Sequence, residues 1–319
     1  MGGVSDGLRS RLLERRDFLV GSAAIAAISP FVPRVVWGHG PKTHREMIGD
    51  VELTVISDGH LTIPSNVLAP QAPRDEFEAT MMERFGQVPE TVRAETNHAI
   101  LRVGNDLILV DNGSGKDFQP NAGKLLEHLQ INGIDPADVT KLVFTHAHPD
   151  HVWGTLGANG GLNFPNADYY VAGAEFDFWM DPDTMTALPA DFHPFVIGAR
   201  RDLTAIEDRM IRVKDGDMIG DGISAISTPG HTPGHISVLV DHGEGLIIGG
   251  DVVGNDHVHF AHPEWAFGFD AIPEQGIDTR KRLLDRLATD RHRLLGYHFT
   301  YPGTGYVERA GTGYRLVAG

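Results

Sequence analysis

Short apolar runs, several of them alternating with polar residues, recur along the chain and predict β-strands, because successive side chains on a strand point to opposite faces. In the first half these runs are residues 51–55, 61–63, 98–103, 107–110, 141–145 and 169–172. Asp58-Gly59 and residues 104–106 carry the small and polar residues that are typical of turns between neighbouring strands. The first half of the chain is therefore rich in strands.

The second half repeats this rhythm, with strands predicted at residues 223–227, 236–240, 246–248 and 294–296. Helices are predicted at residues 124–132, 175–180 and 280–287, and residues 181–194 form a looser, proline-containing section. No low-complexity tract or clean linker divides the chain after residue 37. We therefore expect an α/β fold, a four-layer αββα sandwich formed by one domain over residues 38–319.

The first 37 residues have the features of an export signal. Arg15-Arg16 precedes an uncharged, alanine-rich stretch, residues 18–33, that is too short to span a bilayer comfortably. This arrangement resembles a twin-arginine signal, and an ordinary N-terminal helix is the alternative. We expect residues 1–37 to be removed and the mature protein to be periplasmic or secreted, without stable membrane insertion.

Charge and composition narrow the set of partners. The chain has 27 Lys plus Arg against 43 Asp plus Glu, a formal charge of −16, which repels nucleic acid and anionic lipid surfaces. We expect a small-molecule substrate, no nucleic acid partner and, as the commonest default, a homodimer. Cysteine is absent, so disulfides, thiol nucleophiles and cysteine metal ligands are excluded.

One hexapeptide concentrates groups that bind metals. The run His146-Ala147-His148-Pro149-Asp150-His151 directly follows the strand predicted at residues 141–145. His146 and His148 lie on the same side of an extended segment, so both imidazoles can bind one ion. Asp150 and His151 lie in the turn beyond Pro149, where they can face a second ion. The hexapeptide therefore predicts a metal site.

Three later segments supply further metal-binding side chains. They are Thr228-Pro229-Gly230-His231, Gly249-Gly250-Asp251 and Gly296-Tyr297-His298, and each follows an apolar strand. The ends of strands present functional groups from a rigid scaffold. Spacing alone does not decide between His231 and His235 in the repeated TPGH. The alternative explanation, unrelated surface histidines and a turn aspartate, requires a coincidence at every segment.

The motifs HAHPDH, TPGHTPGH, GGD and GYH, in this order, resemble the metallo-β-lactamase superfamily. Residues 56–59, 176–179, 301–305 and 313–315 make the methyl parathion hydrolase-like group the nearest match within it. By position, the resemblance implies that one metal is held by His146, His148 and His231. It implies that the other is held by Asp150, His151 and His298, with Asp251 as the bridge. His235 is then a structural residue or a support for a ligand.

Histidine and aspartate ligands suit two divalent ions, with zinc expected and manganese, iron or cobalt as alternatives. Two such ions, two carboxylates and a bridging hydroxide carry a net positive charge, which favours an electron-rich transition state. The resemblance thus implies a binuclear hydrolase in which the hydroxide attacks an ester, lactone or phosphotriester bond. Asp150 is expected to orient the hydroxide and pass a proton to the leaving group.

Several residues near these motifs have an interpretation of their own. The resemblance places four loop aromatics around the metal cleft as an apolar wall, with core packing as the alternative for each: Phe118, Trp179, Phe192 and Phe195. His257, His259 and His262 are interpreted as part of a loop at the edge of the cleft rather than a further metal site. Lactonases of this superfamily commonly carry a tyrosine shortly after the bridging aspartate, whereas this chain has Val252-Val253-Gly254.

Other functions remain open for the same ligands. An iron-dependent, sulfur dioxygenase-like oxidoreductase uses the same fold, and so do thioester and β-lactam hydrolases. A metal-binding scaffold without turnover is a further alternative, which an intact ligand set disfavours. Metal analysis separates the iron enzyme from the hydrolases, and a panel of substrates ranks the hydrolases among themselves.

Overall fold

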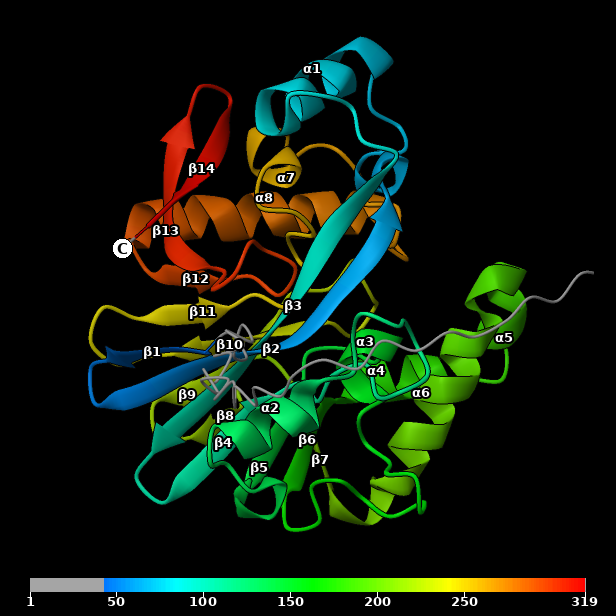
Figure 1. Cartoon of the computed structure of the whole chain (residues 1–319), viewed down its shortest axis with the longest axis vertical. Helices are drawn as coiled ribbons and strands as arrows, with labels where there is room; N and C mark the ends of the chain where they lie inside the picture. The colour runs from blue at the N-terminus through cyan, green and yellow to red at the C-terminus, as the bar shows by residue number, and fades with distance from the viewer. Residues whose placement is uncertain (1–42, 319) are drawn as a thin grey trace, which may run out of the picture. The chain divides into compact units, whose positions relative to one another are not determined.

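Two seven-stranded β-sheets face each other in the computed structural model, which describes residues 43–318 (Figure 1). The first sheet contains, in spatial order, β1 (Thr43–Ile48), β2 (Val51–Pro64), β3 (Thr91–Val103), β4 (Asp106–Val110), β5 (Lys141–Phe144), β6 (Asp168–Ala172) and β7 (Met210–Val213). Strands β1 to β4 pair antiparallel, and β4 to β7 pair parallel. The first sheet is therefore mixed.

The second sheet is formed by the C-terminal part of the chain. Its spatial order is β14 (Gly313–Val317), β13 (Thr304–Ala310), β12 (Arg293–Leu295), β11 (Leu246–Ile248), β10 (Ile236–Val240), β9 (Ile223–Ser227) and β8 (Met218–Gly220). Only β11 and β12 pair parallel among these described strands. Because β9 and β11 both run antiparallel to β10, the strands β9, β11 and β12 all end at the same edge of the sheet.

The alternating side chains of β4 show how the layers are held together. Ile108 and Val110 belong to the buried cluster between the two sheets, where they meet residues such as Val238 of β10. Leu107 and Leu109 belong to the cluster on the outer face of the first sheet. A period of two in the sequence therefore assigns each residue of β4 to one of two hydrophobic cores.

Helices cover the outer face of each sheet. Leu129 of α2 (Leu125–Ile131), Trp179 of α4 (Gly173–Met180) and Leu203 of α6 (His193–Ala205) are buried against the first sheet. Leu284 and Leu287 of α8 (Pro273–Asp290) are buried against the second sheet. Figure 1 shows α6 and α8 on opposite outer sides. The four-layer αββα sandwich predicted from the sequence is confirmed.

Several short elements connect these layers. They are η1 (Ser65–Leu68), α1 (Arg74–Phe85), η2 (Pro136–Asp138), α3 (Pro149–Val152), α5 (Thr184–Ala187), η3 (Ala190–Phe192), η4 (Glu207–Arg209) and α7 (Val258–Ala261). The section predicted to be loose, residues 181–194, contains α5, η3 and the start of α6. Pro194 lies in the first turn of α6, a position where its missing N–H costs no helical hydrogen bond.

The turn predicted at Asp58-Gly59 is wrong. Strand β2 continues through these residues, with an irregularity in its pairing to β3 between Ser57 and His60. The Asp58 carboxylate accepts backbone N–H groups of Ser114 and Leu125, at 3.0 and 2.7 Å. Asp58 therefore anchors the loop between β4 and α2. Its polar side chain can lie in the middle of a strand because these backbone N–H groups bind it.

The predicted export signal, residues 1–37, lies outside the described residues. Within residues 43–318, no helix combines the length and the apolar character that crossing a membrane requires.

Candidate metal centre

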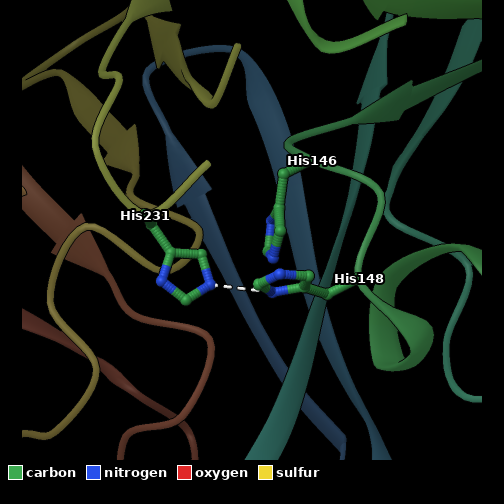
Figure 2. Close-up of side chains that lie close together, drawn as sticks. All are labelled: His146, His148 and His231. Carbon is green, nitrogen blue, oxygen red and sulfur yellow. Dashed lines mark hydrogen bonds between the residues drawn. The ribbon is translucent and has the colours of Figure 1, made fainter. Parts of the chain in front are cut away.

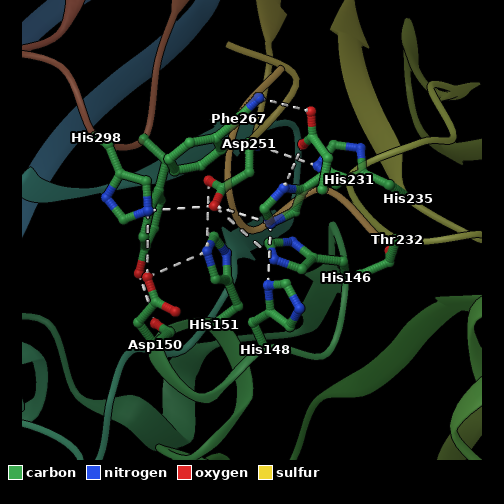
Figure 3. A network of polar contacts seen from close by, with 12 residues as sticks. His146, His148, Asp150, His151, His231, Thr232, His235, Asp251, Phe267 and His298 are labelled. Carbon is green, nitrogen blue, oxygen red and sulfur yellow. Dashed lines mark hydrogen bonds and ion pairs between the residues drawn. The ribbon is translucent and has the colours of Figure 1, made fainter. Parts of the chain in front are cut away.

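The segments predicted to bind metal converge at one edge of the two sheets (Figure 3). His146 follows β5, whereas His231, Asp251 and His298 follow β9, β11 and β12, which all end at this edge. The backbone N–H of Ile236 donates to the carbonyl oxygen of Thr145 at 2.9 Å, which joins the second sheet to the first beside the site. Strand direction in each sheet therefore brings distant parts of the sequence together.

One group of histidines consists of His146, His148 and His231, drawn in Figure 2. Nδ1 of His148 lies 3.0 Å from Nε2 of His231. Each of the three side chains is buried, and their ligand atoms lie within 4.8 Å of one another. His148 immediately precedes α3, whose first residue is Pro149. The extended residues before α3 thus direct His146 and His148 to the same point, as the sequence predicts.

Two further groups lie beside the first; one shares His146 with it, and the two share His151 with each other. They are His146, His151 and Asp251, and Asp150, His151 and His298. Asp251 Oδ2 lies 3.3 Å from His231 Nε2 and 3.2 Å from His298 Nε2, so its carboxylate stands between the outer members of the site. Within residues 43–318, the three groups include every ligand predicted from the sequence and no other residue.

The chemistry of these donor atoms fits bound cations. Nε2 of His146 and His151 and the oxygens Oδ2 of Asp150 and Oδ1 of Asp251 are buried without any hydrogen-bond partner. A buried polar atom without a partner costs roughly 1–3 kcal/mol, and here four such atoms belong to one cluster. Imidazole nitrogen and carboxylate oxygen are typical zinc ligands. Coordination to metal satisfies all four atoms at once.

The pKa shifts of His146, His148 and Asp251 favour the protonation states that bind metal. Burial and the neighbouring imidazoles lower the pKa of His146 and His148 well below their usual range, so both rings are neutral at pH 7. Burial disfavours charge on Asp251, but His298 and His151 hold the pKa of its carboxyl well below the usual range. His146, His148 and Asp251 therefore already have the protonation state that binds metal. Burial disfavours charge on His151 and His298 as well, but the carboxylates of Asp251 and Asp150 raise the pKa of both rings, so each would release its proton when metal binds.

A second ring of hydrogen bonds orients the ligands. His151 Nδ1 is 2.8 Å from Oδ2 of Asp111, which also accepts the hydroxyl of Thr145 at 2.8 Å. His231 Nδ1 is 3.0 Å from Oδ1 of Asp270, and the buried Arg280 donates to the other oxygen of Asp270 at 3.0 Å. Such partners fix the tautomer and the orientation of a ligating histidine.

Glu175 of α4 connects two of the ligand loops. Its Oε1 accepts the backbone N–H of Ala147 at 2.8 Å and the indole N–H of Trp179 at 2.6 Å. Its Oε2 accepts the hydroxyl of Thr232 at 2.6 Å and the backbone N–H of Gly234 at 3.1 Å. All four partners donate to a carboxylate that is 1% exposed. The residue thereby joins the hexapeptide to the loop that carries His231.

Sequence reasoning missed Asp111, Glu175, Asp270 and Arg280 as contributors to the site. Asp111 directly follows the strand predicted at residues 107–110, and its φ of 59° is unusual for a residue other than glycine. His235 lies outside the three groups of ligands, and its Nε2 accepts the backbone N–H of Asp251 at 3.0 Å. No local pattern in the sequence indicates these partners, because each contact crosses a long stretch of chain.

An open cavity lies above the ligands, with about 430 Å³ of empty space when the part open to solvent is included. Its walls are formed by Leu61, Ile63, Ala94, Phe118, Gln119, Phe195, Phe267 and Phe269, and its floor by His148, Asp150, His231, Asp251 and His298. No Lys or Arg contributes to this lining of described residues. The cavity therefore presents the donor cluster to a largely apolar, uncharged space.

Of the four aromatic residues that the sequence predicts around the cleft, two line the cavity and two do not. Phe118 and Phe195 line the cavity and lie 5.8 Å apart, ring centre to ring centre. Phe192 packs behind them, 5.2 Å from Phe195. Trp179 does not line the cavity and is 1% exposed, with its ring 5.8 Å from His148. Trp179 thus supports a ligand from the core.

The histidines of the segment after Asp251 have structural contacts. His257 Nε2 is 3.0 Å from the carbonyl oxygen of Thr80, and His259 Nε2 is 2.7 Å from that of Leu68. His262 stacks on Trp265 at 3.7 Å. None of the three belongs to a group of metal-binding residues within the part of the chain that the structure describes.

Comparison with curated proteins finds partial matches. The chain is 34% identical over 125 residues to the N-acyl homoserine lactonase AttM of Agrobacterium fabrum, a match that covers 36% of this chain and 41% of the relative. It is 33% identical over 133 residues to metallo-beta-lactamase domain-containing protein 1 of Xenopus laevis, covering 41% and 43%. The chain therefore matches about two fifths of the length of these curated relatives.

Solved structures match over almost their full length. AidC, described as a dizinc quorum-quenching lactonase, has a TM-score of 0.82 at 25% identity, and the match covers 88% of this chain and 98% of AidC. The hydrolase AbOPH has a TM-score of 0.81 at 30% identity, covering 87% and 97%. The sequence model that describes the metallo-beta-lactamase superfamily matches residues 92–298, and this range contains every residue of the three groups. The chain belongs to the metallo-β-lactamase superfamily.

Proposed function

We propose that this protein is a binuclear metallohydrolase that opens lactones or cleaves esters with uncharged, apolar substituents. One observation carries the proposal: the metal-binding cluster forms the floor of a cavity whose walls, among the described residues, are apolar apart from Gln119 and contain no Lys or Arg. Two zinc ions are the expected metals, because the ligand set is histidine and aspartate and the similar AidC is described as a dizinc enzyme.

Bound divalent ions supply Lewis acidity and lower the pKa of water, so that a nucleophile forms near neutral pH. The chain itself supplies the group that handles protons. Asp150 lines the cavity, and its Oδ2 lies 3.4 Å from Nε2 of both His151 and His298. Burial opposes its charge, but these imidazoles lower the pKa of Asp150, so the carboxylate is ionised at pH 7. Asp150 accepts a proton and passes it to the leaving alkoxide.

The position of Asp150 is fixed by its neighbours. The hydroxyl of the buried Tyr297 donates to the backbone carbonyl of Asp150 at 2.6 Å, and it is 3.0 Å from Nε2 of His98. Catalysis by proton transfer depends on placement at hydrogen-bond distance, so a rigid backbone at Asp150 favours it. The hydroxyl of Tyr297 is occupied in this network and is therefore not available to the substrate.

The lining of the cavity separates the candidate substrates. β-Lactams and glutathione thioesters carry carboxylates, which are normally bound by Arg or Lys. Neutral lactones with an acyl or alkyl chain need no such partner and match the apolar walls.

Val252 and Val253, which follow Asp251, are buried in the core behind the second sheet. A lactone would therefore be cleaved without a tyrosine at these positions.

A neutral phosphotriester is a second candidate substrate. It carries no net charge, so the absence of Lys and Arg from the cavity favours it as much as a lactone. Its aryl leaving group would pack against Phe118 and Phe195. The resemblance of the sequence to the methyl parathion hydrolase-like group supports the same candidate.

A matched substrate panel tests the proposal. The zinc-loaded protein is given an acylated γ-lactone, an aryl ester, a phosphotriester, a glutathione thioester and a β-lactam, and kcat/KM is measured for each. We expect the neutral substrates to exceed the carboxylate-bearing ones by about a hundredfold or more. Asp251→Asn is the inactive control. A higher kcat/KM for the thioester or the β-lactam would contradict the proposed substrate class.

A further inference from the structure

Gln119 differs from the other residues that form the cavity wall. Apart from the metal-binding residues of the floor, it is the only polar side chain among the described residues that line the cavity. It lies in the loop between β4 and α2, directly after Phe118. In a binding pocket with apolar walls, a single polar group can determine which substrate binds, because it forms a hydrogen bond with one substrate and not with another.

The oxygen of the Gln119 carboxamide is fixed by strand β2. Among the described residues, β1 pairs with β2 only as far as Ile56, so β2 has an open edge beyond that point. The backbone N–H of Thr62 donates to Oε1 of Gln119 at 2.9 Å. Two residues earlier, the N–H of His60 donates to the carbonyl oxygen of Asn121 at 3.0 Å. The loop thus runs along the open edge of β2, and Gln119 is anchored there through its acceptor.

The hydrogen bond from Thr62 uses only the oxygen of the Gln119 carboxamide and leaves its NH2 group unbound among the described residues. A primary amide has one acceptor oxygen and an NH2 group with two donors. The oxygen of Gln119 is used by Thr62, and the described residues provide no hydrogen bond for its nitrogen. Because the amide is planar, the hydrogen bond from Thr62 to the oxygen restricts the directions in which the NH2 group can point. Gln119 therefore offers a donor that has no partner among the described residues, beside a largely apolar cavity.

We propose that Gln119 determines substrate specificity by donating to a neutral carbonyl oxygen that is separate from the bond being cleaved. The inference rests on the proposed function and narrows it. Among lactones, it selects those that carry an amide on the ring over those that carry an alkyl chain of equal length. The apolar walls bind the chain, and Gln119 binds the amide carbonyl between the chain and the ring.

Two substitutions separate this role from a structural one. Gln119→Glu keeps an oxygen for the N–H of Thr62 but removes both donors, whereas Gln119→Met removes the donors and the acceptor without adding charge. If Gln119 only caps the edge of β2, Gln119→Glu leaves the selectivity of the enzyme unchanged. If it binds substrate, both variants lose activity on one class of lactone.

The experiment measures kcat/KM for an α-acylamino-γ-lactone and for the α-alkyl-γ-lactone of the same chain length. We expect the wild type to prefer the acylamino lactone, and both variants to lose about fivefold to tenfold on that substrate, through KM, while the alkyl lactone changes less than about twofold. Equal kcat/KM for the two lactones in the wild type, or equal losses in the variants, would overturn the role of Gln119. Failure of the wild type to cleave either lactone would instead reject the proposed function and, with it, the inference.

Discussion

The carboxylate of Glu175 accepts the backbone N–H of Ala147 at 2.8 Å, between the two ligands His146 and His148. Its other oxygen accepts the backbone N–H of Gly234 at 3.1 Å, in the loop that carries His231. One buried side chain thus sets the spacing of a ligand group whose members come from both sheets. A change at Glu175 is therefore expected to affect metal binding without touching a ligand.

We predict that Glu175→Gln weakens zinc binding about tenfold to a hundredfold. The amide of glutamine places an NH2 group against either Ala147 N–H or Gly234 N–H, so two donors face each other and one loop must shift. Competition with a chromophoric chelator measures the zinc affinity. Glu83→Gln, at an exposed position of α1, is the matched control. Unchanged zinc affinity in Glu175→Gln would show that the loops keep their spacing without this carboxylate.

Asp270→Asn is expected to weaken the site through His231. One oxygen of the Asp270 carboxylate lies 3.0 Å from Nδ1 of His231, and the other accepts a hydrogen bond from the guanidinium of Arg280 at 3.0 Å. Asparagine lacks the negative charge of Asp270. That charge makes His231 a stronger ligand and also forms an ion pair with the buried Arg280, so we expect zinc affinity to fall about tenfold or more. Asp278→Asn, at an exposed position of α8, the helix that carries Arg280, is the control. If both variants bind zinc equally well, Asp270 does not tune this ligand.

Acid stability offers a test of His235. Burial lowers the pKa of His235 to about 3, so the folded protein keeps it neutral while the unfolded chain takes up a proton below about pH 6.5. Stability is therefore lost as the pH falls from 6.5 toward 3, by about 2 kcal/mol at pH 5 from this residue. Glutamine does not titrate and can accept the N–H of Asp251. Between pH 6.5 and 5, the Tm of metal-free His235→Gln should fall less than that of the metal-free wild type, and equal slopes would argue against a neutral buried His235.

Phe195→Ala is expected to raise KM for substrates with long apolar chains. The ring of Phe195 lines the cavity beside Phe118 and packs against His148 at 5.7 Å. Losing this surface costs about 1.5–3 kcal/mol of apolar burial at most, so KM rises about tenfold with a small change in kcat. Ile197→Ala, on the same α6 helix but 61% exposed, is the control. A chain-length series of lactones measures the effect, which should shrink as the chain is shortened.

The residues that the structure brings together in the three groups can be singled out from the sequence because their pattern is local. His146, His148, Asp150 and His151 lie within one hexapeptide, and the remaining ligands each follow an apolar strand. Strand periodicity likewise predicts the two cores on either side of β4. Both signals depend on neighbours a few residues away, which a single sequence displays directly.

The rest of the site depends on contacts between residues far apart in the chain. His151 and Asp111 are separated by 40 positions, and Glu175 and Gly234 by 59. Asp58-Gly59 has the composition of a turn, yet three loop N–H groups, those of Ser114, Gly123 and Leu125, bind the Asp58 carboxylate within a continuing strand. Tertiary hydrogen bonds therefore override the local propensity, and no alternation in the sequence indicates which buried carboxylate meets which loop.

The central claim is that the ligands of this site hold two metal ions that carry out hydrolysis. The most direct test is to count metal ions per chain by elemental analysis and to measure lactone hydrolysis on the same preparation, before and after chelation and after zinc is restored. We predict two zinc ions per chain at the three overlapping ligand groups, with activity that is lost on chelation and regained with zinc. A single iron per chain with oxygen uptake, or hydrolysis that persists without metal, would contradict it.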